Sequence, residues 1–111
     1  MLFYRLVRSS EPDESDFLSW AEKGQPVPPG LSEEEEAPYY SVSVFDSLGA
    51  AVAQARAVGW KLGEYVAELD IPDDGSVPWV QEGSNLAHYG LYGTTAVDLK
   101  ARARIPAVHI R

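Results

Sequence analysis

Three residues have the types and positions that suit a polar, anionic ligand. Arg5 interrupts the apolar run at residues 2–7, where a charged side chain needs water, a carboxylate or an anionic ligand. Ser41 and Ser43 are two residues apart in a strand-like run, so both hydroxyls project to one side and could position a ribose. A salt bridge for Arg5 and a half-exposed strand for the serines explain the same residues without a ligand.

Glu68 and Asp70 are the clearest pair of carboxylates. In an extended strand the two side chains point the same way and lie about 7 Å apart. Two such groups can differ in pKa and serve as acid and base. The alternative is the solvated face of an antiparallel strand.

Aromatic side chains gather at residues 88–92. Tyr89 and its neighbours could stack on a planar ring, or they could pack in the core. Gly90 and Gly93 dilute this strand-like run, which indicates a bend, a bulge or the close approach of a ligand or backbone.

Metal and nucleotide motifs are missing from the sequence. No glycine-rich phosphate loop follows a strand, and there is no cysteine. The two histidines, His88 and His109, are 21 residues apart with no carboxylate at ligand spacing, so we predict that each is structural or at the surface.

The net charge of −8 lies in one part of the chain. Residues 11–37 hold nine acidic residues against one base, Lys23, whereas the other residues hold eight acids and eight bases. An acidic chain is a poor candidate for binding nucleic acid, which requires neutralisation of phosphates. The absence of cysteine, of a signal peptide and of an apolar run long enough for a membrane span leads us to expect a cytoplasmic protein that does not enter a membrane.

Periodicity predicts a single α+β domain over residues 1–111. It should contain small antiparallel or mixed sheets of about five strands with two to three short helices. We expect strands at 2–7, 39–45, 64–71, 88–93 and 104–110, an edge segment near 79–80, and helices at 13–23, 47–58 and from 95. Residues 25–38 are rich in proline and glutamate and should form a mobile acidic loop.

The order of these pieces resembles that of small bacterial ADP-ribosyltransferase-like domains. The matching pieces are the opening strand with Arg5, the serine strand followed by an alanine-rich helix, residues 64–69, and residues 88–93. The resemblance implies an NAD site in a cleft between two small antiparallel sheets. Arg5 would then lie near phosphate, and Ser41 or Ser43 would brace the cleft. We expect an NAD site formed by Arg5, Ser41, Ser43 and Tyr89.

The family's catalytic glutamate lies in a Glu-x-Glu or Gln-x-Glu motif, which this chain lacks. Glu68 is the nearest substitute in the sequence, although the pair at 68–70 has the wrong order and Gln81-Glu82 lacks the spacer. Two other functions remain open. One is a noncatalytic interaction module, inhibitor-like or antitoxin-like, whose segment 11–37 engages a basic partner. The other is a small-ligand binding domain without turnover.

Overall fold

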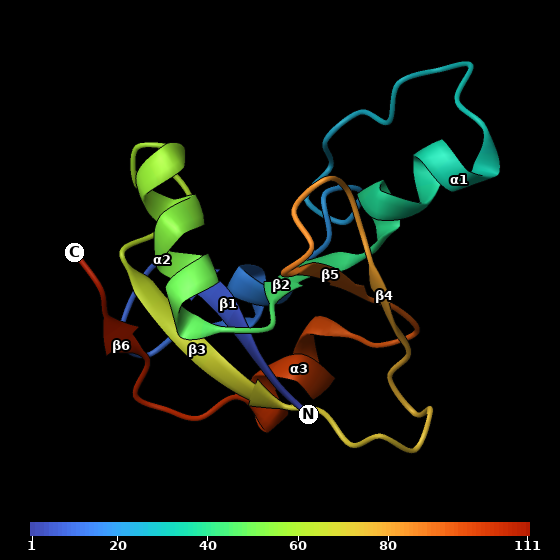
Figure 1. Ribbon diagram of the computed structural model, residues 1–111. Coiled ribbons are helices and arrows are strands. Elements are labelled where there is room, and N and C mark those ends of the chain that lie inside the picture. Colours follow the sequence, from blue (N-terminus) through green and yellow to red (C-terminus); the bar gives the residue numbers. More distant parts are fainter.

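Six strands form one antiparallel sheet in the computed structural model, which describes residues 1–111 (Figure 1). Their order across the sheet is β4-β5-β2-β1-β3-β6. The α+β class is confirmed, but the strands form one antiparallel sheet and not several small sheets, because β1 bridges β2 and β3. The sheet has one strand more than the expected five because the edge segment pairs as β4. The strands are β1 Leu2–Val7, β2 Val42–Phe45, β3 Tyr65–Asp70, β4 Trp79–Gln81, β5 His88–Leu91 and β6 Val108–His109.

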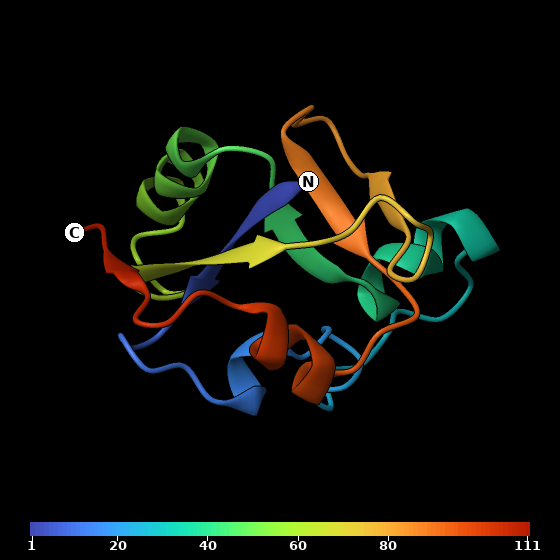
Figure 2. The ribbon, with the colours of Figure 1, turned by 90° about the horizontal axis from the view of Figure 1, so that it is seen from below.

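The sheet is almost divided between β1 and β2. β1 pairs with β3 over six positions, from Leu2 opposite Asp70 to Val7 opposite Tyr65. It pairs with β2 at a single position, Tyr4 opposite Phe45. Figure 2 shows β1, in blue, and β2, in green, running apart from one another. The sheet therefore consists of two three-stranded halves, β4-β5-β2 and β1-β3-β6, with a gap in backbone pairing between them.

Helices cover both faces of the sheet (Figure 2). Helix α2, Leu48–Ala57, packs on one face over a small cluster that includes Leu6, Ala51 and Val66. Helix α3, Ala96–Arg102, and the 3₁₀ helix Glu14–Phe17 pack together on the opposite face, over the main core. Phe3 and Val7 belong to that core, as the predicted alternation of β1 requires. Full burial of such side chains contributes roughly 1.5–3 kcal/mol each.

Local sequence signals explain where the two longer helices begin. The hydroxyl of Ser47 accepts a hydrogen bond from the backbone N–H of Ala50 at the start of α2, and Thr95 does the same for Asp98 at the start of α3. Gly59 follows α2 in the left-handed conformation, with φ of 65°, and ends the helix. Both helices agree with the predicted helices at 47–58 and from 95.

The predicted helix at 13–23 is wrong, because the only helix there is the single 3₁₀ turn Glu14–Phe17, and a separate hydrogen-bonded turn follows at 20–24. The carbonyl oxygens of Asp16 and Leu18 accept hydrogen bonds from the Arg5 guanidinium. Those oxygens would have to accept backbone N–H groups if an α-helix continued. Arg5 therefore replaces helical hydrogen bonds with tertiary ones.

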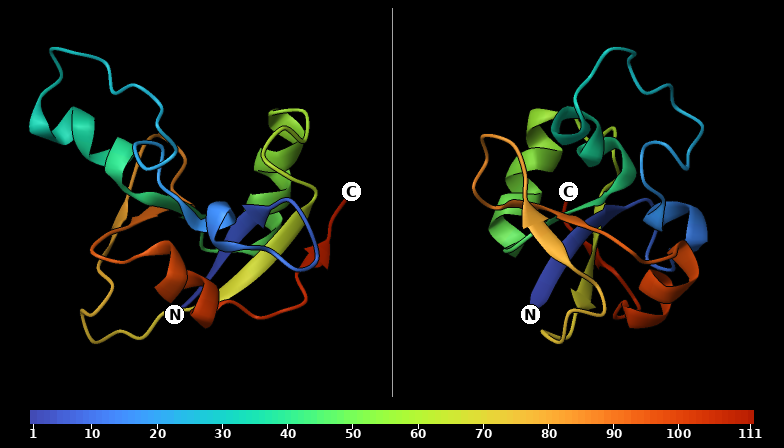
Figure 3. Two further views of the ribbon diagram at one scale, coloured as in Figure 1. Left: turned by 180° about the vertical axis from the view of Figure 1, so that it is seen from behind. Right: turned by 90° about the vertical axis from the view of Figure 1, so that its right-hand side faces the viewer.

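Residues 25–38 are not entirely irregular. A one-turn helix, α1, spans Glu33–Glu36, and Ser32 and Glu35 form a reciprocal capping box at its start. A 3₁₀ turn at Ala37–Tyr40 follows, so the strand predicted at 39–45 begins only at Val42. Figures 1 and 3 show α1 and the preceding chain standing away from the sheet at one end of the molecule.

The last predicted strand, 104–110, shortens to the two residues of β6. Residues 104–107 turn between α3 and β6, and the backbone N–H of Ala107 donates to the carbonyl of Ser10 instead of pairing within the sheet. A proline at 106, which has no N–H to donate, is compatible with that turn.

Candidate functional site

A cavity of about 780 Å³ extends from the divided junction of the sheet. Arg5 of β1 and Ser43 of β2 lie in its wall, together with residues of the segment 15–23 and of the loop that leads into β5. Its volume lies within the usual range for small-molecule sites. The same gap in strand pairing that separates the two halves thus brings their side chains to one cavity.

Arg5 is held by backbone carbonyls rather than by a carboxylate. Its Nε donates to Asp16 O at 2.9 Å, Nη1 to Ser43 O at 2.7 Å, and Nη2 to Leu18 O at 3.2 Å. Burial lowers the pKa of Arg5 to about 10, and the nearby Asp16 only partly opposes this. The guanidinium ties β1 to β2 and to the segment after β1, and no acidic side chain forms an ion pair with it.

Two further cations, Arg8 and Lys23, line the cavity beside Arg5. Neither forms an ion pair. The pKa of Lys23 is lowered, first by partial burial and then by the positive charges of Arg5 and Arg8. The cavity walls hold three cations against two carboxylates, those of Asp16 and Glu82. A positive cluster of this kind in an acidic protein attracts anions.

Glu82 supplies a buried carboxylate at the other side of the cavity, with 7% of its surface exposed. The Ser41 hydroxyl donates to Glu82 Oε1 at 2.8 Å, and the Tyr92 hydroxyl donates to Oε2. Burial, and then the hydrogen bond to Glu82, raise the pKa of Tyr92 to about 12. Two hydroxyl donors thus partner a charge that would otherwise be costly to bury.

Gly90 makes room for this carboxylate. A Cβ atom at Gly90 would lie 2.0 Å from Glu82 Oε1 and 2.6 Å from Ser41 Oγ. The close approach that the glycines of residues 88–93 indicated is therefore made by a side chain of the protein itself. Gly90 is opposite Ser43 in the β2–β5 register, which places the glycine on the strand that faces the serines.

The structure places the sequence-predicted residues in two groups. Arg5, Ser41 and Ser43 line the cavity, whereas Glu68 and Tyr89 do not. Glu68 lies on β3, opposite Tyr4 of β1. Its carboxylate accepts a hydrogen bond from the Tyr4 hydroxyl at 3.4 Å and lies 3.7 Å from Nη1 of Arg104. Tyr89 packs against Phe3 beside the main core, with ring centroids 5.5 Å apart.

The strand geometry explains this division. β3 is separated from β2 by β1, so Glu68 lies across a strand from the serines. Along β5 the side chains alternate, and His88 lines the cavity while Tyr89 points to the core.

The sequence analysis did not identify Glu82, Arg8 and Lys23 as cavity residues. The usable signals were Gly90 and the isolation of Lys23 among the acids of residues 11–37.

The histidines occupy separate environments. His88 Nδ1 lies 3.0 Å from the carbonyl oxygen of Glu82, and His109 stacks on Tyr65 and lies 3.6 Å from Glu64. No group of three or more His, Cys, Asp or Glu side chains has the arrangement of a metal site. No helix has both the length and the apolar character needed to span a bilayer.

The chain matches no protein-family model, no curated protein and no solved structure. Its function must therefore be inferred from the residues of the cavity and their geometry.

Proposed function

We propose that this chain is an NAD-binding domain of the ADP-ribosyltransferase type. One observation carries the proposal: Arg5, Ser41, Ser43 and the carboxylate of Glu82 line a single cavity where two small antiparallel sheet halves meet. This combination of arginine, serine and glutamate is the one that the sequence resemblance implied, with Glu82 in place of Glu68 as the acidic residue.

The positive cluster of Arg5, Arg8 and Lys23 would hold the pyrophosphate of NAD. Three backbone contacts leave Arg5 with two further N–H groups, since a guanidinium carries five. With the charge of Asp16 included, the cluster has a net charge of +2, which is opposite to the two charges of a pyrophosphate. Glu82, at the other side of the cavity, brings the net charge of the whole wall to +1. Arginine and lysine are the side chains that proteins most use to bind phosphate groups.

Glu82 would act at the ribose. When bound, NAD supplies the ADP-ribosyl group, with nicotinamide as the leaving group. Ser41 and Tyr92 fix the Glu82 carboxylate and are themselves fixed by it. A carboxylate oriented in this way can accept a hydrogen bond from a ribose hydroxyl and stabilise positive charge that develops on the sugar. Positioning by Ser41 is the role that the resemblance gives to the serine strand.

Thermal unfolding with and without NAD tests the proposal. Binding to the folded state raises its stability by about 2.7 kcal/mol when the ligand is at a hundred times its Kd. We expect NAD to raise the melting temperature and Lys23→Gln to reduce that rise, because the substitution removes one phosphate partner. Arg5→Ala is a poorer test, because Arg5 also holds three backbone carbonyls.

Lys61→Gln is the matched control, since Lys61 is exposed, lies outside the cavity and loses the same charge. Release of nicotinamide by the wild type, lost in Glu82→Gln while NAD still binds, would support transferase or hydrolase chemistry. Binding without release would identify a domain that binds NAD without turnover. A melting temperature that does not respond to millimolar NAD refutes the proposal.

A further inference from the structure

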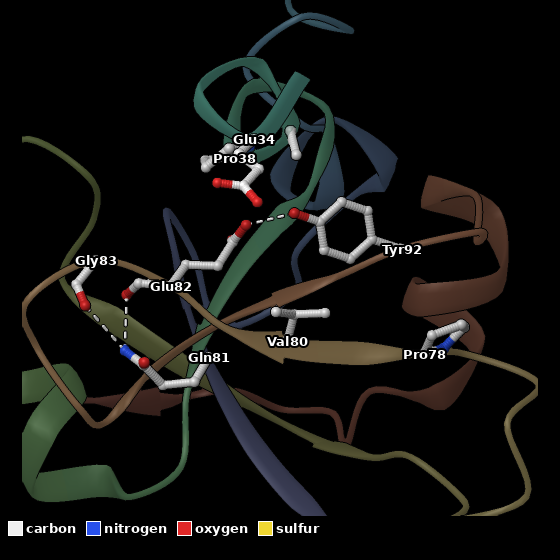
Figure 4. Close-up of a pocket in the computed structure, with 9 residues that line it drawn as sticks. Glu34, Pro38, Pro78, Val80, Gln81, Glu82, Gly83 and Tyr92 are labelled. Atoms are coloured by element: carbon white, nitrogen blue, oxygen red, sulfur yellow. Dashed lines mark hydrogen bonds between the residues drawn. The ribbon is translucent and has the colours of Figure 1, made fainter. Parts of the chain in front are cut away.

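Figure 4 shows the residues that line a second cavity, of about 500 Å³. This cavity lies beside the first and shares Pro38, Glu82 and Gly83 with it. One wall comes from the end of α1 and the turn after it, and the other comes from β4 and from Tyr92. Its apolar lining includes Pro38, Pro78 and Val80, and Val80 is 53% exposed. The nucleotide proposal uses none of these apolar residues.

Carboxylates are the only charged groups in the wall of this second cavity. They belong to Glu34 and Glu82. Figure 4 shows the Glu34 carboxylate turned toward the bond between Glu82 and Tyr92. Glu82 has two hydroxyl donors, but Glu34 has neither a hydrogen-bond partner nor an ion-pair partner in the chain. The cavity therefore combines apolar walls with uncompensated negative charge.

We propose that the second cavity binds a lysine or arginine side chain of a basic segment in a partner protein. Such a side chain has an apolar stem that can lie along Pro38, Pro78 and Val80, and a cationic head that can reach Glu34. The Tyr92 ring offers a further surface for a cation. The acidic residues of α1 would attract the same partner at longer range.

The docking proposal does not require NAD binding, although Glu82 lies in the walls of both cavities. The first cavity holds Arg5, Arg8 and Lys23, which would repel a basic segment, so the two cavities select ligands of opposite charge. The site also limits which part of the acidic segment 11–37 would contact the partner. Of the acidic segment 11–37, the second cavity is lined only by Glu34 and Ala37.

Titration of the ¹⁵N-labelled chain with a hexa-arginine peptide tests the proposal, with hexa-citrulline as the neutral peptide of the same shape. We expect shifts of backbone amide signals at Val80, Gln81 and Tyr92 with hexa-arginine only. Glu34→Gln should weaken binding roughly two- to fivefold, which is the range measured for single exposed ion pairs.

Glu33→Gln is the matched control, since Glu33 is exposed on the same helical turn and loses the same charge but does not line the cavity. A smaller effect of Glu33→Gln supports the site. Equal effects of the two variants, equal binding of hexa-citrulline, or signals that do not move at the second cavity would each overturn it. Failure of NAD to bind would leave these outcomes unchanged.

Discussion

Replacement of Gly90 by alanine should disrupt the buried carboxylate without any change at a charged residue. The new Cβ would lie 2.0 Å from Glu82 Oε1 and 2.6 Å from Glu82 Cδ, which is far inside van der Waals contact. Gly90 does not have a positive φ, so alanine suits its backbone. The side chain of Glu82 is flexible, and we expect it to swing away while the strand stays in place.

The cost of that movement follows from the hydrogen bonds lost. Glu82 gives up the donors Ser41 and Tyr92, and a hydrogen bond to a charged group is worth about 1.5–3 kcal/mol. Water reaches the displaced carboxylate, and the single hydroxyl hydrogen of Ser41 can turn to the carbonyl of Pro38, 3.1 Å away. We therefore expect a loss of about 2 kcal/mol for the pair of bonds. At about 4 °C per kcal/mol for a domain of this size, the melting temperature should fall by about 8 °C.

Calorimetry or circular dichroism on a set of variants provides the assay. In Gly90→Ala combined with Glu82→Ala, the colliding carboxylate is absent and only the Ser41 hydroxyl, 2.6 Å from the new Cβ, has to rotate. Gly90→Ala should therefore cost much less in the Glu82→Ala background than in the wild type. Gly49→Ala is the control, because a Cβ there meets nothing within 4 Å and alanine favours the helix by roughly 0.5–1 kcal/mol. An unchanged melting temperature for Gly90→Ala, or additive losses in the double variant, would refute the role assigned to Gly90.

Three further outcomes are expected. Arg5→Lys should lower the free energy of unfolding, measured by urea denaturation, by about 3 kcal/mol. The reason is that a lysine ammonium cannot reach the three carbonyl oxygens that Arg5 contacts in two segments. A loss under about 1 kcal/mol would contradict this. The pKa of Tyr92 is raised in the folded protein from 10.0 to about 12, so the stability that its hydroxyl contributes is complete below pH 10 and is lost as the pH rises to 12. The loss of stability in Tyr92→Phe, relative to the wild type, should therefore shrink between pH 10 and 12. A loss that stays constant over this interval would exclude a link between Tyr92 ionisation and folding. Asp98 has a lowered pKa, owing first to Thr94 and then to Arg102, so its contribution is present above 3.8 and lost in more acid solution. Asp98→Asn should therefore have a lower urea midpoint than wild type at neutral pH and the same midpoint in acid.

The sequence predicted those parts of the fold whose signals are local. Strand-forming residues identified β1 and period-two alternation identified β3. Capping residues predicted the start of α2 at Asp46 or Ser47, of which the structure uses Ser47, and the start of α3 at Thr95. The predicted helix at 13–23 does not form, because the guanidinium of Arg5 on β1 donates to carbonyl oxygens that the helix would need as acceptors. No window of residues 13–23 contains that information.

For the candidate site, the sequence by itself identified Arg5, Ser41 and Ser43 as polar groups on apolar strands, and it identified the acidic character of residues 11–37. Tertiary structure alone decided which carboxylate joins them. Glu82 is 41 residues from Ser41 and reaches it only because β4 pairs with β5 and β5 with β2. Glu68 has a clearer pattern, but β1 separates its strand from the serines. Spacing along one strand fixes the direction of its side chains, whereas the order of strands in the sheet determines which side chains meet.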